Sequence, residues 1–263
     1  MASRLRAFQA RLLPHGPLDL ARQVLLFVVA YNVYRLVRGG ADAPGAAGAA
    51  FQHARDLIDI ERGMHVFVEP AIQSWAMSSK PLIDAASWAY VNAQTSITLG
   101  ALVYIYLRHN RSFYFVRNMF LVAWTIALVG YVVFPTAPPR MFPEWGFVDA
   151  VSDFFGVSHD NHTVDALFNP YAAVPSMHVC FALMIGVPLA RLVRNPVVRA
   201  FWAVYPLLVV FVIVATANHF LADAFLGACT AGAGALTARW LARARPAVWT
   251  FGASRPSGTA QPT

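Results

Sequence analysis

The chain has few charged residues, and this scarcity excludes most soluble folds. Of its 263 residues, 13% are Asp, Glu, Lys or Arg, whereas a typical soluble domain carries about 25%. Hydrophobic residues make up 58% of the chain. So few charges could not cover the surface of a water-soluble protein of this length, and we therefore expect an integral membrane protein.

Cysteine is also scarce, and the common zinc patterns are missing. Cys180 and Cys229 lie inside apolar runs, so we interpret them as packing residues and expect no disulfide framework. The sequence contains no HExxH motif and no cysteine set for zinc. His159, Asp160 and His162 leave a metal enzyme as one alternative, but HDNH is typical of a solvated loop. We expect no metal and no cofactor.

Long apolar runs predict the fold class. Residues 114–135 and 199–217 are each long enough to cross a bilayer core, which takes about 20 residues. We predict an all-α, polytopic membrane bundle of about six transmembrane helices, with no internal repeat. The expected spans are 18–37, 82–107, 115–135, 174–193, 199–217 and 219–238. We assign 1–17 to a cytoplasmic N-terminal segment, 18–245 to the membrane domain and 246–263 to a disordered cytoplasmic tail.

The net charge of +7 suggests a nucleic-acid partner at first sight, but its distribution indicates membrane orientation. With the N-terminus inside, 14 of the 20 basic residues fall in cytoplasmic segments, and most acidic residues fall on the other side. The 14 are Arg4, Arg6, Arg11, Arg22, Arg108, Arg111, Arg117, Arg191, Arg194, Arg199, Arg239, Arg243, Arg245 and Arg255. This asymmetry follows the positive-inside rule. We expect both termini in the cytoplasm, the plasma (inner) membrane as location, and no nucleic-acid partner.

The first span has a competing interpretation as a cleaved signal peptide, because a basic start and an apolar run precede the small-residue stretch ADAPGAAGAA. The segment before the apolar core is long, however, and Arg35 and Arg38 separate that core from any cleavage point. We expect the first helix to be retained, and mass spectrometry of the N-terminus would test this.

Two outer loops have different compositions. In 38–81, apolar residues recur at three- and four-residue spacing with charges between them, which predicts one or two amphipathic helices at the membrane interface. The loop 136–173 is rich in Pro, aromatic and acidic residues and is too long for a mere connector. In the last span, Gly227, Gly234 and other small residues are spaced for close helix contact, which we expect within the bundle rather than in a homodimer.

Several polar residues stand where an apolar span would exclude them. Ser176 and His178 begin the fourth span, and His219 and Asp223 begin the sixth. His178 and His219 are 41 residues apart, which fits one span in and one span out, so both histidines should lie at the outer end. Asp223 follows His219 by four residues and shares its helical face. An aspartate in a span costs up to about 2.5–3.5 kcal/mol, which argues for a function over hydrogen bonding between helices.

The second loop begins with PTAPPR, which holds Arg140 just outside the third span. Its guanidinium offers a fork of donors that suits phosphate oxygens. An arginine that binds lipid headgroups is the alternative, and the nearby histidines favour phosphate recognition.

At these residues the sequence resembles the type 2 phosphatidic acid phosphatase superfamily, through PSMH at 175–178 and the spacing of His219 and Asp223. The runs PTAPPR, NPYAAVPSMH and TANHFLAD are similar to the branch that includes inositol phosphorylceramide synthases. The similarity covers most of residues 60–238, and it identifies 18–245 as a domain of this type.

The resemblance implies a metal-independent, two-step phosphoryl transfer. His219 is implied to be the nucleophile, Asp223 to orient its ring, and His178 to protonate the leaving oxygen. Ser176 and Arg140 are implied to hold phosphoryl oxygens. We expect Thr216 and Asn218, which flank the nucleophile, to add hydrogen bonds. The implied partner is a lipid phosphate or phospholipid substrate, cleaved at the extracytoplasmic face.

The chain departs from the phosphatase pattern at two cationic positions. The pattern expects a lysine where Val133 stands, and a Ser-Arg pair where Val212 and Ile213 stand. Either Lys80 and Arg62 substitute for these cations, or the site accepts a less charged phosphodiester. Head-group transfer, as by an inositol phosphorylceramide synthase, therefore remains an alternative to hydrolysis.

A non-enzymatic transporter or lipid-binding protein is a further alternative. Transport pathways usually place polar or broken segments near the middle of the bilayer. Here the polar residues gather at one end, and the interiors of the third and fifth spans are almost wholly apolar. The sequence therefore favours an enzyme.

Overall fold

The structure is a computed structural model that describes residues 13, 15–40, 46–156 and 171–244. The described residues form helices and no strand, with one isolated bridge between Thr136 and Ala172. The helices are α2 (Gly16–Gly40), α3 (Ala46–Gly63), α4 (Glu69–Met77), α5 (Lys80–Trp88), the π-helix η1 (Ala89–Ala93), α6 (Gln94–Arg108), α7 (Asn110–Val133), the 3-10 turns η2 (Pro139–Met141) and η3 (Pro143–Trp145), α8 (Ala150–Phe155), α10 (Met177–Leu192), α11 (Pro196–Ala215) and α12 (Leu221–Ala244).

The prediction of an all-α membrane bundle is confirmed. Three helices of the described chain, α7, α11 and α12, are long and apolar enough to cross a membrane, and α10 is apolar but shorter. Helices also occupy the other two expected spans: α2 covers the first, and the continuous stack α5–η1–α6 covers the second. The structure therefore has a helix or helical stack at each of the six segments that the sequence predicts.

The long helices pack through small residues. α12 lies against α7 and α10, and α10 lies against α11. A Cβ added at Gly227 of α12 would lie 2.3 Å from the Ser176 carbonyl oxygen, and one at Gly186 of α10 would lie 2.8 Å from the Trp202 carbonyl oxygen. A Cβ added at Gly234 of α12 would lie 3.2 Å from the Met119 carbonyl oxygen. These close approaches place the small residues at contacts within the bundle.

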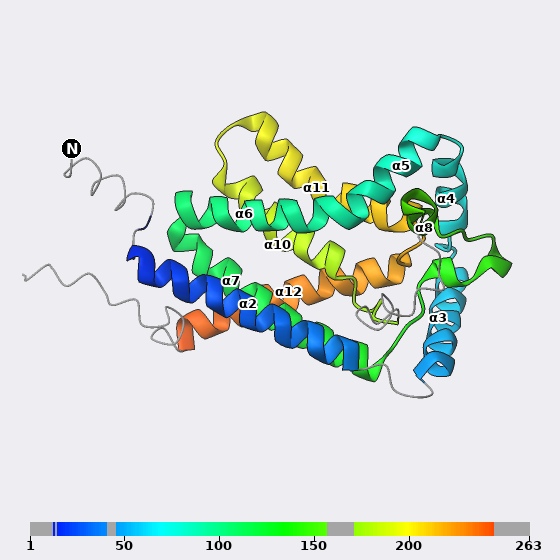
Figure 1. Cartoon of the computed structure of the whole chain (residues 1–263), viewed down its shortest axis with the longest axis horizontal. Coiled ribbons are helices and arrows are strands. Elements are labelled where there is room, and N and C mark those ends of the chain that lie inside the picture. The colour runs from blue at the N-terminus through cyan, green and yellow to red at the C-terminus, as the bar shows by residue number, and fades with distance from the viewer. Residues whose placement is uncertain (1–12, 14, 41–45, 157–170, 245–263) are drawn as a thin grey trace, which may run out of the picture.

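The two helices expected in the first outer loop are α3 and α4, which lie across the end of the bundle where α10 and α12 begin (Figure 1). A separate hydrophobic cluster joins α3 to the second loop and to the start of α12. Its buried members are Ala50, Ala54, Ile58, Ala137, Phe142, Phe147, Ala217 and Phe220. These helices therefore cover the expected site and form part of its wall.

A polar network joins α2, α6 and α7 near the opposite end of the bundle. The hydroxyls of Tyr106 and Tyr114 each donate to Asp19 Oδ2 at 2.9 Å, and Gln23 Nε2 donates to Asp19 Oδ1 at 3.0 Å. Arg117 Nη1 donates to Gln23 Oε1 at 2.9 Å. We call Asp19, Gln23, Tyr106, Tyr114, Arg117 and Asn118 the arginine cluster.

Arg117 is buried in the first half of α7. It is one of the basic residues that we count on the cytoplasmic side, it lies within the expected third span, and its side chain is fully buried at 0% exposure. Its Nε donates to Asn118 Oδ1 at 2.9 Å, and its guanidinium lies 5.2 Å from the centre of the Tyr114 ring. A buried guanidinium needs such partners because an unpaired buried charge is very costly.

Candidate active site

The histidines from two different helices meet at one end of the bundle. The rings of His178, in the first turn of α10, and His219, just before α12, have centroids 5.5 Å apart at an angle of 60°. His219 Nδ1 lies 3.2 Å from Asp223 Oδ2. The structure thus brings together the three residues for which the sequence predicts a catalytic role.

The turn from α11 into α12 sets the position of His219. The N–H of Ala217 donates to the Val214 carbonyl oxygen, and the N–H of Asn218 donates to the Ile213 carbonyl oxygen. This pair of bonds is the Schellman arrangement that ends many helices. The arrangement needs a left-handed residue, usually glycine, and Ala217 adopts that conformation here with φ of 52°. A tight, buried turn therefore delivers His219 to the α10 side of the site.

Asp223 serves both His219 and the helix start. Its Oδ2 accepts the backbone N–H of Phe220 at 3.0 Å, besides contacting the His219 ring. A carboxylate in the first turn that accepts from the preceding backbone N–H is half of a capping box. The Asp223 backbone carbonyl in turn accepts the Ser176 N–H at 3.1 Å. One residue therefore orients the ring and ties the beginnings of α10 and α12 together.

Two further carboxyls cap the same helix, and sequence reasoning missed both. Glu69 Oε1 accepts the Leu221 N–H at 2.8 Å, and Glu61 Oε1 accepts the Ala222 N–H at 2.7 Å. Both glutamates are buried, at 0% and 1% exposure. The first N–H groups of a helix lack partners within it, and its positive end favours anions. The outer helices α3 and α4 thus fix the first turn of α12.

Burial and the proximity of Glu69 favour the protonated form of Glu61. Burial, and next the negative charge of Glu69, raise the pKa of Glu61 to about 8. Glu61 Oε2 and Glu69 Oε2 are buried and have no donor among the described protein groups. The raised pKa favours a protonated Glu61 carboxyl, which can donate a hydrogen bond to the neighbouring Glu69 carboxylate.

Arg140 is held at the site from several sides. Its backbone N–H donates to the Ala217 carbonyl oxygen at 2.8 Å, and its Nη1 donates to Asn218 Oδ1. Its Nε lies 3.3 Å from Asp149 Oδ2. Asn218 Nδ2 donates to the carbonyl and hydroxyl oxygens of Thr216, both at 3.0 Å. Thr216 and Asn218 therefore fix the turn and the guanidinium; sequence reasoning missed Asp149.

Ser176 is buried beside the histidines. It is the residue just before α10, and its hydroxyl makes no capping bond to that helix. The Ser176 Oγ atom has no hydrogen-bond partner among the described groups, and the same holds for Asp223 Oδ1. Buried polar atoms in proteins are almost always paired, so an unpaired hydroxyl in this position fits a group that a ligand engages.

Other residues named from the sequence make their contacts elsewhere. Lys80 is exposed and pairs with Asp84 at 2.7 Å, on α5. The Arg62 guanidinium lies 5.0 Å from the centre of the Phe67 ring and 5.3 Å from that of Trp145. The HDNH stretch, with His159, Asp160 and His162, lies outside the described residues. Within the described ranges, no three His, Cys, Asp or Glu side chains are grouped to hold a metal ion.

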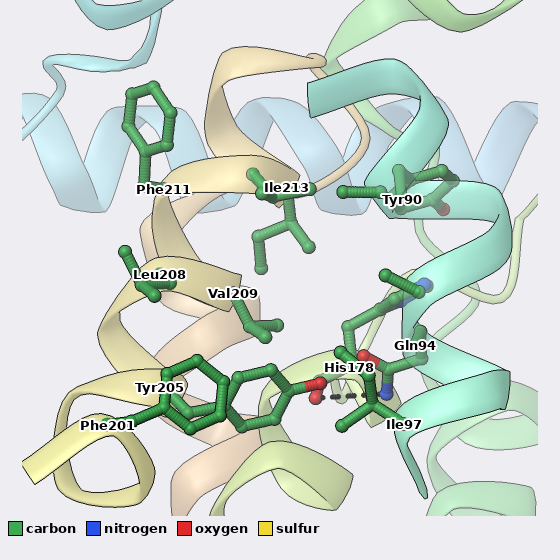
Figure 2. A pocket seen from close by; sticks show the side chains of 13 residues that line it. Tyr90, Gln94, Ile97, His178, Phe201, Tyr205, Leu208, Val209, Phe211 and Ile213 are labelled. Carbon is green, nitrogen blue, oxygen red and sulfur yellow. Dashed lines mark hydrogen bonds between the residues drawn. The ribbon is translucent and has the colours of Figure 1, made fainter. Parts of the chain in front are cut away.

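An apolar pocket of about 300 Å³ adjoins His178. Figure 2 shows one wall from α11, the other from η1 and α6, and His178 between them. Tyr90 of η1 stacks on the His178 ring with centroids 4.5 Å apart, and Gln94 Nε2 donates to the His178 carbonyl oxygen at 3.2 Å. The π-helix η1 interrupts the stack α5–α6 at this point, and such interruptions are frequent at functional sites.

A comparison with family models identifies the family of the chain. The family model described as PAP2 superfamily matches residues 55–237, which is most of the chain and contains every residue of the site above. No curated protein and no solved structure matches the chain significantly. The chain belongs to the PAP2 superfamily, and this membership supports an enzyme of the phosphatase or phosphotransferase type.

Proposed function

We propose that this PAP2 superfamily protein is an integral membrane enzyme that cleaves a phosphate ester of a lipid through a phosphohistidine intermediate. The observation that carries the proposal is the meeting of His178 and His219 from separate helices, with His219 Nδ1 on Asp223. Two imidazoles at this separation can act on opposite sides of one phosphorus atom.

In the first step, His219 Nε2 attacks phosphorus while the bond from phosphorus to the ester oxygen breaks. Asp223 contacts the other ring nitrogen, so it orients the ring and stabilises the positive charge that develops on it. His178 gives a proton to the departing oxygen, which leaves as an alcohol. The products of this step are a phosphohistidine and the released alcohol.

In the second step, His178 accepts a proton from water or from an acceptor alcohol, whose oxygen attacks phosphorus. The bond from phosphorus to nitrogen breaks, and His219 is restored. Water yields free phosphate or a phosphomonoester, whereas an alcohol yields a new ester. Hydrolysis and transfer therefore use the same residues.

Phosphoryl oxygens are held by the donors beside the histidines. Arg140 supplies the positive charge, and Asn218 and Asp149 hold its guanidinium in place. The buried Ser176 hydroxyl supplies a hydrogen bond to a phosphoryl oxygen. The carbonyl and hydroxyl oxygens of Thr216 hold Asn218 in place. Lys80 is a candidate only for contacting the phosphate of a substrate as it approaches the site.

The reaction takes place at the extracytoplasmic face. The distribution of basic residues supports a topology with both termini inside, and the site lies at the end of the bundle covered by α3 and α4 (Figure 1). The substrate is then a lipid whose head group lies in the outer leaflet.

Transfer of a phosphate-bearing head group is the second candidate, favoured by the charges at the site. Val133 is 71% exposed on α7, and Val212 and Ile213 are apolar, so none supplies the cations of the phosphatase pattern. Arg140 shares its charge with Asp149, and three carboxyls surround the start of α12. A phosphodiester carries less negative charge than a monoester and suits such a site better.

Product identification tests the proposal. Purified protein in detergent is incubated with lipid phosphates and with phospholipids, with and without inositol-bearing donors or acceptor alcohols, and the products are identified by mass. Free phosphate or a phosphomonoester indicates hydrolysis, and a new phosphodiester indicates transfer. His219→Ala should abolish both, and full turnover by this variant would show that His219 is not the nucleophile.

A trapping experiment tests the intermediate itself. A phosphate ester with an aryl leaving group needs no general acid, so His178→Ala should still form the phosphohistidine but resolve it slowly. Radiolabelled phosphate should then remain on the protein, in an acid-labile and base-stable bond at His219. Absence of label from His178→Ala, with turnover retained by the parent, would refute the covalent step.

A further inference from the structure

We infer that the apolar pocket between η1, α6 and α11 binds one acyl chain of the substrate while its phosphate lies at His178 and His219. This inference rests on the proposed function and adds a second, physically separate part to the site. Its lining includes Ala93, Ile97, Phe201, Tyr205 and Val209.

The lining has the chemistry of a hydrocarbon site. Apart from His178, Gln94 and two tyrosines, every residue that lines the pocket is apolar. Gln94 is already engaged with the His178 carbonyl oxygen (Figure 2). A polar head group would therefore find few hydrogen-bond partners along the walls. A saturated chain forms no hydrogen bonds and would lose none on entering the pocket.

The length of the pocket matches one leaflet. Its lining follows α11 from Phe201 to Ile213, which at the rise of an α-helix is about 18 Å. Half of a bilayer hydrocarbon core is about 15 Å. Ile213 marks the end near His219, and Phe201 the far end, so an extended chain anchored at the histidines would reach about as deep as its neighbours in the leaflet.

The pocket also communicates with the outside of the bundle. Phe201 and Leu208 line it and are among the exposed apolar residues of α11. An acyl chain can therefore enter the pocket laterally from the bilayer core, and the head group does not have to pass through the pocket. A chain moving from the bilayer gains little hydrophobic energy, since lipid tails are as apolar as the walls. The pocket then acts by orienting the ester toward His178 rather than by tight binding.

Filling the pocket tests this role. Ala93→Phe and Val209→Phe place rings in it from opposite walls, and Leu207→Phe and Leu99→Phe are matched controls at exposed positions of α11 and α6 outside it. Activity is measured in detergent on a long-chain and a short-chain phosphate ester. We expect the pocket variants to lose at least tenfold in kcat/KM for the long chain only, with the short-chain rate and both controls within twofold of the parent.

The outcomes separate this inference from the proposed function. Equal losses on both esters, or no loss on either, would overturn the acyl-chain site while the phosphoryl-transfer proposal stands. A lipid phosphate with a photoreactive group at the chain end gives a second measurement on the parent protein, which does not depend on the folding of a variant. Cross-links near Phe201 and Tyr205 support the site, and cross-links confined to other helices refute it. Cross-links there without turnover of any ester would mean that the pocket binds a chain but the proposed function fails.

Discussion

Two buried polar clusters of the described residues lie at opposite ends of the helical bundle, and they differ in how completely their atoms are paired. Of six buried side-chain atoms without a hydrogen-bond partner among the described residues, four belong to Glu61, Glu69, Ser176 and Asp223. None belongs to the arginine cluster. We call these four residues, together with His178 and His219, the histidine cluster.

The difference in hydrogen-bond pairing distinguishes a structural network from a candidate catalytic site. In the arginine cluster the acceptors of Asp19 are met by two hydroxyls and an amide, so the network fastens α2 to α6 and α7. In the histidine cluster the Ser176 hydroxyl has no partner among the described residues, and under the proposed function it donates to a phosphoryl oxygen. We therefore expect substitutions in the arginine cluster to lower stability, and substitutions of His178, His219 and Asp223 to lower the rate.

The largest expected effect comes from Asp223→Asn. The amide keeps an oxygen for the Phe220 N–H but no longer stabilises a positively charged His219 ring, so we expect kcat to fall by about 10³-fold, within the range of acid–base and orientation effects. The thermal midpoint in detergent should change little. A variant that keeps the parent rate would remove Asp223 from the chemistry.

Arg117→Met should give the opposite pattern. Loss of one partner in a buried charged network costs about 3 kcal/mol, because Gln23 and Asp19 lose their arrangement. We expect a lower thermal midpoint and an unchanged kcat per folded molecule, measured after titrating the active fraction. A variant with normal stability and a slow reaction would contradict the division between the two clusters.

The sequence predicts the histidine cluster only in part. His178, His219 and Asp223 are recognisable because a span of fixed length separates the histidines and four residues separate His219 from Asp223. Glu61 and Glu69 are not recognisable in the sequence, because an amphipathic helix pattern assigns acidic residues to solvent. In the structure they cap the start of α12, at residues that lie 161 and 152 positions further along the chain. Asp149 likewise meets Arg140 only through tertiary structure.

The membrane spans show the same division between local and tertiary information. Hydropathy predicts 82–107 as one span, but it does not locate the π-helix at Ala89–Ala93, where Tyr90 packs on the His178 ring. The small residues of α12 predict close packing, but not which element approaches. The structure shows that Gly227 meets the start of α10.

Gly227→Ala tests how tightly the histidine cluster is assembled. The new Cβ would lie 2.3 Å from the Ser176 carbonyl oxygen, so α10 and α12 must move apart. Overpacking of this kind costs about 1–3 kcal/mol, and we expect both the thermal midpoint and kcat to fall. Gly232→Ala is the control on the same helix, where nothing lies within 4 Å. It should be neutral or stabilising by up to about 1 kcal/mol.

A pH dependence of stability should arise from Glu61. Its pKa is about 8 in the folded protein, above the ordinary glutamate value of 4.5, so between these two pH values the folded state holds a proton that the unfolded state has released. Stability therefore falls as pH rises from about 4.5 to about 8. Glu61→Gln, which keeps an oxygen for the Ala222 N–H, should flatten the thermal midpoint across this range, with Asp84→Asn on exposed α5 as control. An equally steep dependence in Glu61→Gln would assign the titration to another group and leave the two glutamates as simple helix caps.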